Sequence, residues 1–254
     1  MYKILANTLF LGKDIHFLTD CHSTNDIALE AVRKKKVQEG SIFITNHQTQ
    51  GKGQRGNSWE AKPGENLTFS LVLEPKFLDL SEQFYLNIAV SNAIRRCFQE
   101  YVPELQVKWP NDLVVEGFGK LGGILIENLV NSSGWEFAVV GIGLNINQRE
   151  FASPQATSLA QVTGSQFPLE ELVKLLVVHL EQAYISLKKG KIGLLKQEYL
   201  QHLYLADQWA LYRVGEQELE GKIVGLAESG NLLVQLPSGK QQSFGIKEIA
   251  FPNF

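Results

Sequence analysis

The chain has 254 residues, of which 44% are hydrophobic, and its formal net charge at pH 7 is −3. This length and composition suffice for one large globular domain, or for a main domain with a small satellite. The negative balance argues against nucleic acid as a partner, because Lys and Arg contacts to phosphates supply most non-specific affinity. No stretch approaches the length of a membrane span, so we expect no membrane partner either.

The first residues and the cysteines indicate the compartment. Residues 1–10 lack the basic start, the continuous apolar stretch and the small-residue cleavage site of a secretory signal. Cys21 and Cys97 cannot form a framework of disulfides, and neither belongs to a Cys-x-x-Cys pair. We therefore expect a cytoplasmic protein without structural zinc. The histidines show no ligand spacing, so we predict no structural metal.

The first part of the chain predicts a helix, two strands and a long loop. Ser23 and Thr24 precede an apolar rhythm typical of a capped helix that ends before Gly40. Two segments have the composition of strands: 41–45 and 67–73. Residues 46–63 between them are rich in Gly, Gln, Lys and Asn and lack both periodicities. Because long loops inside compact domains are usually functional or mobile, this loop is a candidate site.

Beyond the loop, helices and strands are mixed without regular alternation. Amphipathic helices are predicted over 81–101, 169–187 and 194–204. Strand-like pieces lie around Val107 and over 113–115, 122–127 and 137–142. We therefore expect an α+β fold, in which a mixed β-sheet has helices packed on one side.

The sequence pattern changes after Ala206. Short β-type runs follow, separated by turns that contain glycine, over 209–214, 218–226, 232–236 and 241–244. We place the domain boundary near Asp207, with a main domain over 1–206 and a small β-barrel or sandwich over 207–254.

The loop over 48–59 combines glycines, two cations and an aromatic residue. Glycines permit conformations that aim successive N–H groups at an anion, and Lys52 and Arg55 add positive charge there. The spacing fits neither the Walker A motif nor the dinucleotide fingerprint. Alone, the loop indicates either an anion site or only a flexible connection.

Two further segments, 108–112 and 120–127, each begin with a lysine. Lys120 opens an apolar strand, so its ammonium would lie at a strand end, where it can neutralise charge that develops on a ligand. The two glycines that follow suggest that a ligand or another backbone packs closely. The alternative is a turn-entry lysine beside a bulge. A third segment, 141–147, has the pattern of a strand with small residues and asparagine amides.

Taken together and in order, these segments resemble the biotin–protein ligase family. Its matching motifs are Ser-Thr-Asn at 23–25, the loop over 48–59 with Pro-Gly-x-Asn-Leu at 63–67, Lys-Trp-Pro-Asn-Asp at 108–112, the strand over 120–127 and Gly-x-Gly-x-Asn at 141–145. Lys-Trp-Pro-Asn-Asp with a following Lys-x-x-Gly-Ile is highly specific. The β-rich tail, with Lys-Glu-Ile at 247–249, is similar to the family's SH3-like C-terminal domain.

The resemblance implies an enzyme that activates biotin with ATP to biotinoyl-5′-adenylate and releases pyrophosphate. The acyl group would then pass to one lysine of the biotin carboxyl carrier domain of an acyl-CoA carboxylase. Magnesium would accompany the ATP, and the enzyme would be a monomer or a homodimer. Only about 20 residues precede Ser23. Because a DNA-binding winged helix cannot fit there, we expect the monofunctional form, a ligase without repressor activity.

The resemblance also implies two sets of binding residues. The biotin set is Ser23, Thr24, Asn25, Gln48, Lys52, Gly53, Gln54, Lys120 and Gly123. The ATP and adenylate set is Gly51, Lys52, Arg55, Trp59, Lys108, Asn111 and Asn145. Ser23, Thr24 and Gln48 would hydrogen-bond the ureido ring, whose N–H donors and carbonyl need complementary partners. Trp59 would shield the mixed anhydride from water.

The catalytic residues implied in this way are Lys120, Arg55 and Asp112. Lys120 would bring the biotin carboxylate and the nucleotide phosphate together, and would stabilise oxyanion charge when the carrier lysine attacks. Asp112, with Asn111, would position magnesium, the nucleotide or the incoming lysine.

The loop departs from the family at Gln54, where many members have an arginine. A neutral amide cannot clamp phosphate as a guanidinium does, so Arg55 or Lys52 should hold more of the adenylate charge. Arg55→Ala should weaken retention of the intermediate, and unchanged adenylate release would contradict this.

Three other functions remain open. A lipoate ligase or octanoyltransferase shares the fold, and a transferase of that kind uses a cysteine, for which Cys21 beside His22 or Cys97 are candidates. A non-catalytic binding protein is the second possibility, and a DNA-binding regulator is the third. Pyrophosphate exchange with biotin or lipoate, the variant Lys120→Ala and a gel shift would separate them.

Overall fold

The computed structural model describes residues 7–132 and 134–252, apart from the side chain of Arg55. These residues form a seven-stranded sheet with the order β1-β2-β3-β7-β6-β5-β4 and a four-stranded sheet with the order β11-β10-β9-β8. The strands of the larger sheet are β1 (Ile15–Cys21), β2 (Ile42–Gln48), β3 (Leu67–Leu73), β4 (Leu105–Lys108), β5 (Asp112–Val115), β6 (Gly119–Asn131) and β7 (Gly134–Leu144). Only β1 and β2 pair in parallel, so the sheet is mixed and the expected α+β class is confirmed.

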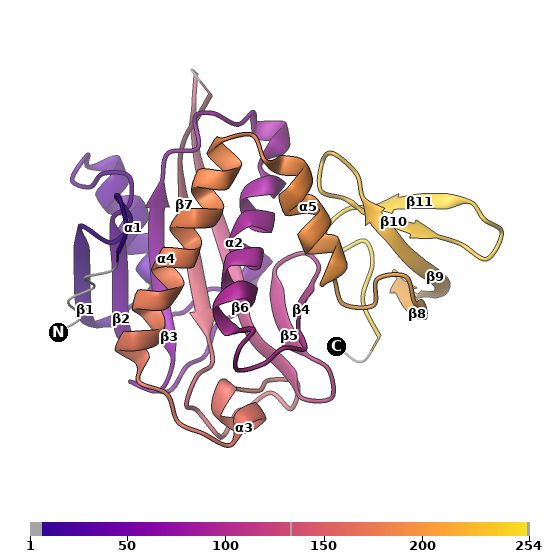
Figure 1. Cartoon of the computed structure of the whole chain (residues 1–254), viewed down its shortest axis with the longest axis horizontal. Coiled ribbons are helices and arrows are strands. Elements are labelled where there is room, and N and C mark those ends of the chain that lie inside the picture. Colours follow the sequence, from indigo (N-terminus) through magenta and orange to yellow (C-terminus); the bar gives the residue numbers. More distant parts are fainter. Residues whose placement is uncertain (1–6, 133, 253–254) are drawn as a thin grey trace.

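Helices cover both faces of the larger sheet. They are α1 (Thr24–Arg33), α2 (Phe84–Phe98), α3 (Leu159–Thr163), α4 (Leu169–Lys188) and α5 (Ile192–Gln201), with short 3₁₀ turns η1 (Gln54–Gly56) and η2 (Leu80–Glu82). In Figure 1, α2 and α4 run across the front of the sheet, as expected. On the other face, Leu29 and Val32 of α1 pack against Phe43, Val72 and Val139. The prediction of helices on one side therefore holds for the long helices and not for α1.

The N-terminus of α1 brings polar side chains into the interior. Ser23 has an extended backbone and its hydroxyl accepts a hydrogen bond from the Asp26 N–H, which caps the helix. Ser23, Thr24 and Asn25 are only 2–3% exposed. Buried polar groups are costly unless they are hydrogen-bonded, so this helix end is a place to look for partners or a ligand.

Strand β1 and helix α3 were not predicted from the sequence. Strand β1 is mostly half-buried at a sheet edge, which leaves little hydrophobic contrast along it. Helix α3 has five residues, too few for a helical period. Strands β6 and β7 run beyond the predicted segments into a partly exposed hairpin.

The smaller sheet consists of β8 (Trp209–Val214), β9 (Gln217–Leu226), β10 (Leu232–Gln235) and β11 (Gln241–Phe244), all antiparallel. It begins two residues after Asp207, where the domain boundary stays a prediction. The Trp109 indole donates to the Gly230 carbonyl at 2.9 Å, and the Lys108 ammonium lies 5.8 Å from the Phe251 ring centroid. These contacts hold the small unit against the Lys-Trp-Pro-Asn-Asp segment.

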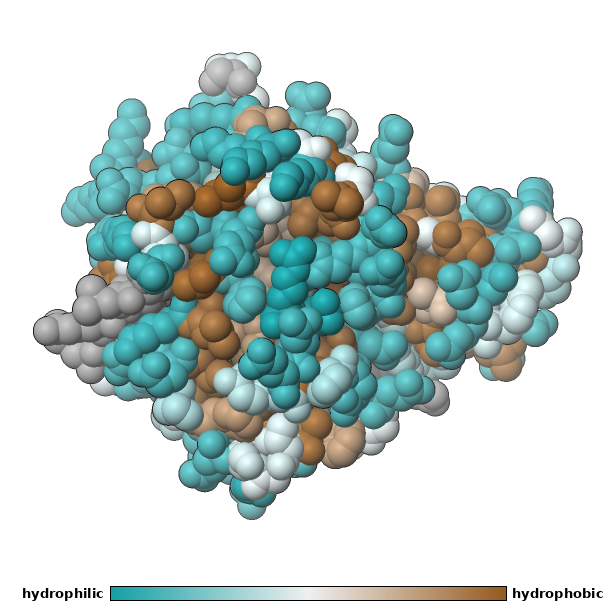
Figure 2. Space-filling view, viewed as in Figure 1, coloured by the Kyte–Doolittle hydropathy of each residue, from teal (hydrophilic) through white to brown (hydrophobic). Residues whose placement is uncertain are grey.

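The surface is that of an ordinary globular protein. On the face seen in Figure 2, hydrophilic residues predominate and hydrophobic ones are interspersed among them. Over the part of the chain that the structure describes, no helix combines the length and apolar character needed to cross a bilayer.

Candidate functional site

A cavity lies where the N-terminus of α1, the loop after β2 and the middle strands β3, β6 and β7 meet, with about 480 Å³ of empty volume. All nine residues of the expected biotin set line it: Ser23, Thr24, Asn25, Gln48, Lys52, Gly53, Gln54, Lys120 and Gly123. Phe69, Ile142 and Leu125 add apolar wall. The folded chain therefore gathers residues from positions 23 to 123 around one pocket with a polar end and apolar sides.

A second cavity adjoins the first, with about 1290 Å³ of empty volume. Three residues of the expected nucleotide set line it: Trp59, Lys108 and Asn145. Lys52 and Asn111 line the first cavity instead, and Gly51 lines neither. The side chain of Arg55 lies outside the described part of the structure. Trp59 and Lys120 border both cavities, so they mark the junction between them.

Asp112 holds two lysines at this junction. Its Oδ1 lies 2.6 Å from Lys120 Nζ, and its Oδ2 lies 3.1 Å from Lys108 Nζ. The side chains of Lys108 and Asp112 are 15% and 16% exposed, and that of Lys120 is 34% exposed. One carboxylate between two ammonium groups leaves a net positive charge in a partly desolvated place. This arrangement suits an anion that reaches the junction from either cavity.

Glycines make room for Trp59 and Lys120. A Cβ at Gly143 would lie 2.5 Å from the Trp59 ring, and one at Gly123 would lie 3.3 Å from Lys120 Nζ. The indole Nε1 of Trp59 is buried and, among the described residues, has no hydrogen-bond partner. A buried donor without a partner is unusual in a folded protein and points to a site that a ligand completes.

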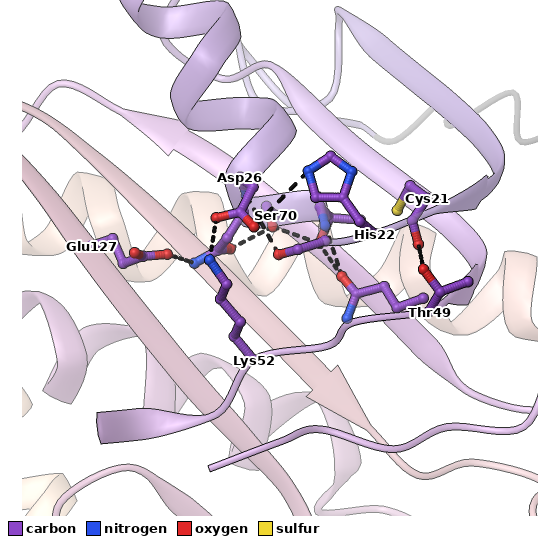
Figure 3. Close-up of polar contacts among 11 residues, drawn as sticks. Cys21, His22, Asp26, Thr49, Lys52, Ser70 and Glu127 are labelled. Atoms are coloured by element: carbon purple, nitrogen blue, oxygen red, sulfur yellow. Dashed lines mark hydrogen bonds and ion pairs between the residues drawn. The ribbon is translucent and has the colours of Figure 1, made fainter. Parts of the chain in front are cut away.

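Backbone hydrogen bonds order the loop that closes the first cavity. The N–H groups of Thr49 and Gln50 donate to the carbonyls of Cys21 and His22, both at 2.9 Å. Lys52 Nζ lies 2.6 Å from Asp26 Oδ1 on α1, and this hydrogen bond raises the pKa of Lys52. In Figure 3 the Lys52 side chain points toward Asp26, with Glu127 close by. The Lys52 ammonium is thus tied to α1.

A buried polar network lies behind the cavity. Gln48 Oε1 accepts from the Thr24 N–H at 2.7 Å, and the Ser70 hydroxyl lies 2.7 Å from Thr24 Oγ1 and 2.5 Å from Asn25 Oδ1. Asn25 Nδ2 donates to Glu127 Oε2 at 2.8 Å (Figure 3).

The sequence reasoning missed several residues that border or support the site. It did not single out Ser70, although a serine in a fully buried, mostly apolar strand was a signal. It also missed Asp26 and Glu127. All residues of the segment 151–156 except Pro154 line the second cavity, and the Gln155 carbonyl accepts from the Lys120 N–H at 2.7 Å. That segment has no periodic pattern and carried no signal.

Neither cysteine is suited to act as a nucleophile. Both are free and buried. Burial raises the pKa of Cys97 to about 12, and burial likewise raises the pKa of Cys21. A thiol must lose its proton to attack, so both side chains stay inert near neutral pH.

Carboxylates and imidazoles do not gather into a metal site. Within residues 7–132 and 134–252, no three His, Cys, Asp or Glu side chains are grouped so that they could hold a metal ion.

Comparison with known proteins defines the class. Residues 18–147 match the Biotin/lipoate A/B protein ligase family, and residues 211–246 match the Biotin protein ligase C terminal domain. The chain therefore belongs to the biotin/lipoate A/B protein ligase family.

Individual relatives are similar over nearly the whole chain. A biotin--[acetyl-CoA-carboxylase] ligase of Paracoccus denitrificans is 28% identical over 228 residues, which cover 86% of this chain and 94% of that protein. The bifunctional ligase/repressor BirA of Bacillus subtilis is 24% identical over 91% of this chain and 72% of its own length. The structure of an Aquifex aeolicus biotin protein ligase in complex with biotin and ATP superimposes with a TM-score of 0.76, at 25% identity, over 94% of this chain and 98% of that one.

Proposed function

We propose that this protein is an ATP-dependent biotin–protein ligase. It activates biotin to biotinoyl-5′-AMP with release of pyrophosphate, and transfers the biotinyl group to one lysine of a biotin carboxyl carrier domain. The observation that carries the proposal is the junction at Lys120, where a cavity with a buried polar end borders a second cavity. Two substrates that must react with each other need two adjoining sites with a shared charged group.

The first cavity fits the two ends of biotin. The ureido ring would lie at the polar end formed by Ser23, Thr24 and Gln48, and the valeryl chain would pass the apolar wall toward Lys120. Lipoate fits this end less well, because its dithiolane ring would leave buried hydroxyl and amide groups unpaired. The unreactive thiols of Cys21 and Cys97 also disfavour an octanoyltransferase.

The first chemical step joins two anions. A carboxylate oxygen of biotin attacks the α-phosphorus of ATP, and pyrophosphate leaves with the electron pair of the broken P–O bond. Lys120, held by Asp112, would neutralise charge on both partners and so lower the repulsion between them. Lys108 and Asn145 would contact the nucleotide in the second cavity.

In the second step, the carrier lysine attacks the acyl carbon of the adenylate as a free amine. The C–O bond to phosphate breaks, AMP leaves, and the attacking nitrogen loses a proton. Lys120 would stabilise the oxyanion that forms on the way. Trp59, packed over Gly143, would keep water from the anhydride until the carrier arrives.

Magnesium would arrive with ATP. No dedicated cage of protein ligands exists among the described residues, and Mg²⁺ at nucleotide sites is usually held by substrate phosphates, waters and one or two carboxylates. The carboxylates of Glu60 and Asp112 line the second cavity, and that of Asp112 is shared by two lysines. No step above depends on the metal.

The carrier we propose is that of an acetyl-CoA carboxylase, because relatives from Paracoccus denitrificans and Mycobacterium tuberculosis bear the name biotin--[acetyl-CoA-carboxylase] ligase. The test is to mix the protein with ATP, magnesium, biotin and a carrier domain, and to measure the mass of the carrier. We expect one added biotinyl group. None should appear without ATP, or on a carrier whose acceptor lysine is replaced by arginine.

Two further experiments separate the biotin ligase from a lipoate ligase and from a non-catalytic binding protein. Lipoate in place of biotin should support neither pyrophosphate exchange nor carrier modification. Lys120→Ala should abolish adenylate formation in a correctly folded protein. An unmodified carrier in the complete mixture would refute the proposed function, and exchange that runs with lipoate alone would reassign it.

A further inference from the structure

We propose that Glu127 sets the direction of a chain of hydrogen bonds that runs through Asn25 and Ser70 to Thr24. The direction leaves the hydroxyl oxygen of Thr24 as an acceptor, which faces an N–H of the ureido ring. Glu127 is therefore a positioning residue for biotin recognition. The inference rests on the proposed function and adds the physical basis of its selectivity.

The amide of Asn25 can be oriented from its neighbours. Its Nδ2 lies 2.8 Å from Glu127 Oε2 and 3.3 Å from the Leu125 carbonyl oxygen. A carboxylate and a carbonyl only accept hydrogen bonds, so the atom that faces them must be the NH₂ group. The carbonyl oxygen of the Asn25 side chain consequently faces Ser70.

The sheet places these groups in one row. Ser70, Gly141 and Leu125 are register partners on the neighbouring strands β3, β7 and β6. Asn25 lies over Gly141, where any Cβ would collide with its amide. The glycine thus lets Asn25 reach both Ser70 and Glu127.

Each hydroxyl in the row has one hydrogen to donate. Asn25 Oδ1 cannot donate, so across the 2.5 Å contact Ser70 must donate to it. Ser70 Oγ then has only lone pairs for Thr24 Oγ1, which lies 2.7 Å away. Two oxygens at that distance need a hydrogen between them, and it must come from Thr24.

The Thr24 hydroxyl has a second acceptor in Gln48. Its Oε1 already accepts from the Thr24 N–H at 2.7 Å, and it lies 3.0 Å from Thr24 Oγ1. The single hydroxyl hydrogen of Thr24 therefore points toward the two acceptors Ser70 Oγ and Gln48 Oε1, and the oxygen keeps its lone pairs for the cavity that Thr24 lines. Because Oε1 is engaged, the NH₂ of Gln48 is the group left to donate. The polar end thus presents an acceptor beside a donor, the complement of a cyclic urea.

Burial makes this pattern selective. Ser70 is fully buried, and Thr24 and Asn25 are each 3% exposed, so water cannot restore a lost partner. In such surroundings an unmatched donor or acceptor costs more than a good hydrogen bond returns. A ligand with an oxygen in place of the N–H would set two lone pairs against each other at Thr24.

Glutamine at position 127 weakens the fixed direction, because the Leu125 carbonyl, 3.3 Å from Asn25 Nδ2, is then the one group that can only accept. Its NH₂ can donate to a flipped Asn25 amide, after which Asn25 donates to Ser70, Ser70 donates to Thr24, and one of the two lone pairs of Thr24 Oγ1 is no longer available to biotin. We therefore expect Glu127→Gln to raise KM for biotin about tenfold, the size of one buried hydrogen bond of about 1.4 kcal/mol. KM for ATP and the melting temperature should hardly move.

The decisive readout uses two biotin analogues, each a cyclic carbamate with one ureido N–H replaced by oxygen. The unaltered protein should discriminate most strongly against the analogue that lacks the N–H facing Thr24. In Glu127→Gln that discrimination should collapse, while discrimination against the other analogue persists. Ser70→Ala, which cuts the same chain, should give the same signature.

Glu136→Gln is the matched control. Glu136 accepts from the Asn131 side chain at 3.0 Å in an exposed Glu–Asn pair, at the end of β7 away from the cavity. It should leave both KM values and both analogue ratios unchanged. An equal rise of KM for biotin and both analogues, or none, would overturn the inference. If the unaltered protein forms no adenylate from biotin, the proposed function fails first and this inference with it.

Discussion

Lys120 and Asp112 form an ion pair, 2.6 Å from Nζ to Oδ1, where the two cavities meet. Lys108 Nζ lies 3.1 Å from the other carboxylate oxygen, Oδ2 of Asp112. The Asp112 carboxylate therefore positions the ammonium groups of Lys108 and Lys120 where the two cavities meet. An ammonium on a flexible four-carbon chain needs such a partner to stay in place.

Asp112→Asn tests this arrangement. The amide keeps the shape and loses the charge, so Lys108 and Lys120 repel each other and Lys120 moves. We expect kcat of pyrophosphate exchange to fall about 10- to 100-fold, since small misplacements of a reacting group have effects of that size. Glu116→Gln removes an exposed carboxylate from the neighbouring hairpin and should be neutral. A variant Asp112→Asn with unaltered kcat would show that Lys120 needs no partner.

Gly143→Ala tests whether the packing of Trp59 against Gly143 shields the adenylate. The added Cβ would lie 2.5 Å from the indole, so the ring must shift away from the strand. We expect adenylate to hydrolyse a few times faster in the absence of carrier, because water gains access to the anhydride. Gly193→Ala is the control, since nothing lies within 4 Å of a Cβ there. Equal hydrolysis rates in both variants would argue against a shielding role.

Asp26→Asn tests the tie between the loop and α1. The side chains of Lys52 and Asp26 are 50% and 27% exposed, so the pair contributes only about 0.2–1 kcal/mol and is screened by salt. We expect adenylate to be released about twofold to fivefold faster at low salt, and the difference to vanish near molar salt. Glu30→Gln breaks the exposed pair with Lys34 on the same helix and should not change release. A salt-independent effect would point to a cause other than this ion pair.

The thiols should be dispensable. Cys21→Ala and Cys97→Ala are expected to keep ligase activity within about threefold, because burial raises the pKa of both thiols, that of Cys97 to about 12. Carrier modification by each variant, followed by mass spectrometry, measures this. Loss of transfer in Cys21→Ala with adenylate formation intact would instead reveal an acyl-thioester route.

His179 should make the fold sensitive to acid. Burial, and then the nearby Arg96, lower the pKa of His179 below its ordinary 6.5. As pH falls below about 6.5 the unfolded chain takes up the proton first, so stability present above that pH is lost on the acid side. His179→Gln should therefore lose less melting temperature than the unaltered protein between about pH 7.5 and 5.5. Identical losses would contradict the assignment.

Local sequence pattern determined much of the fold and of the cavity. The runs 209–214 and 241–244 coincide with β8 and β11, because short strands between glycine turns carry their signal within a few residues. The residues expected to bind biotin line one cavity, because Ser23 to Asn25 form a helix end and Gln48 to Gln54 a glycine loop. Such motifs are contiguous, and contiguous residues can be read along the chain.

Only the tertiary structure could decide how those residues are held. Ser70 and Asn25 are 45 residues apart, and Asn25 and Glu127 are 102 apart, yet they form one hydrogen-bonded row because β3, β7 and β6 are in register over Gly141. Register depends on the pairing of whole strands. The side of the sheet on which α1 packs was likewise settled by contacts with Phe43, Val72 and Val139. The sequence by itself therefore determined the chemistry of the polar groups, while their direction came from distant strands brought side by side.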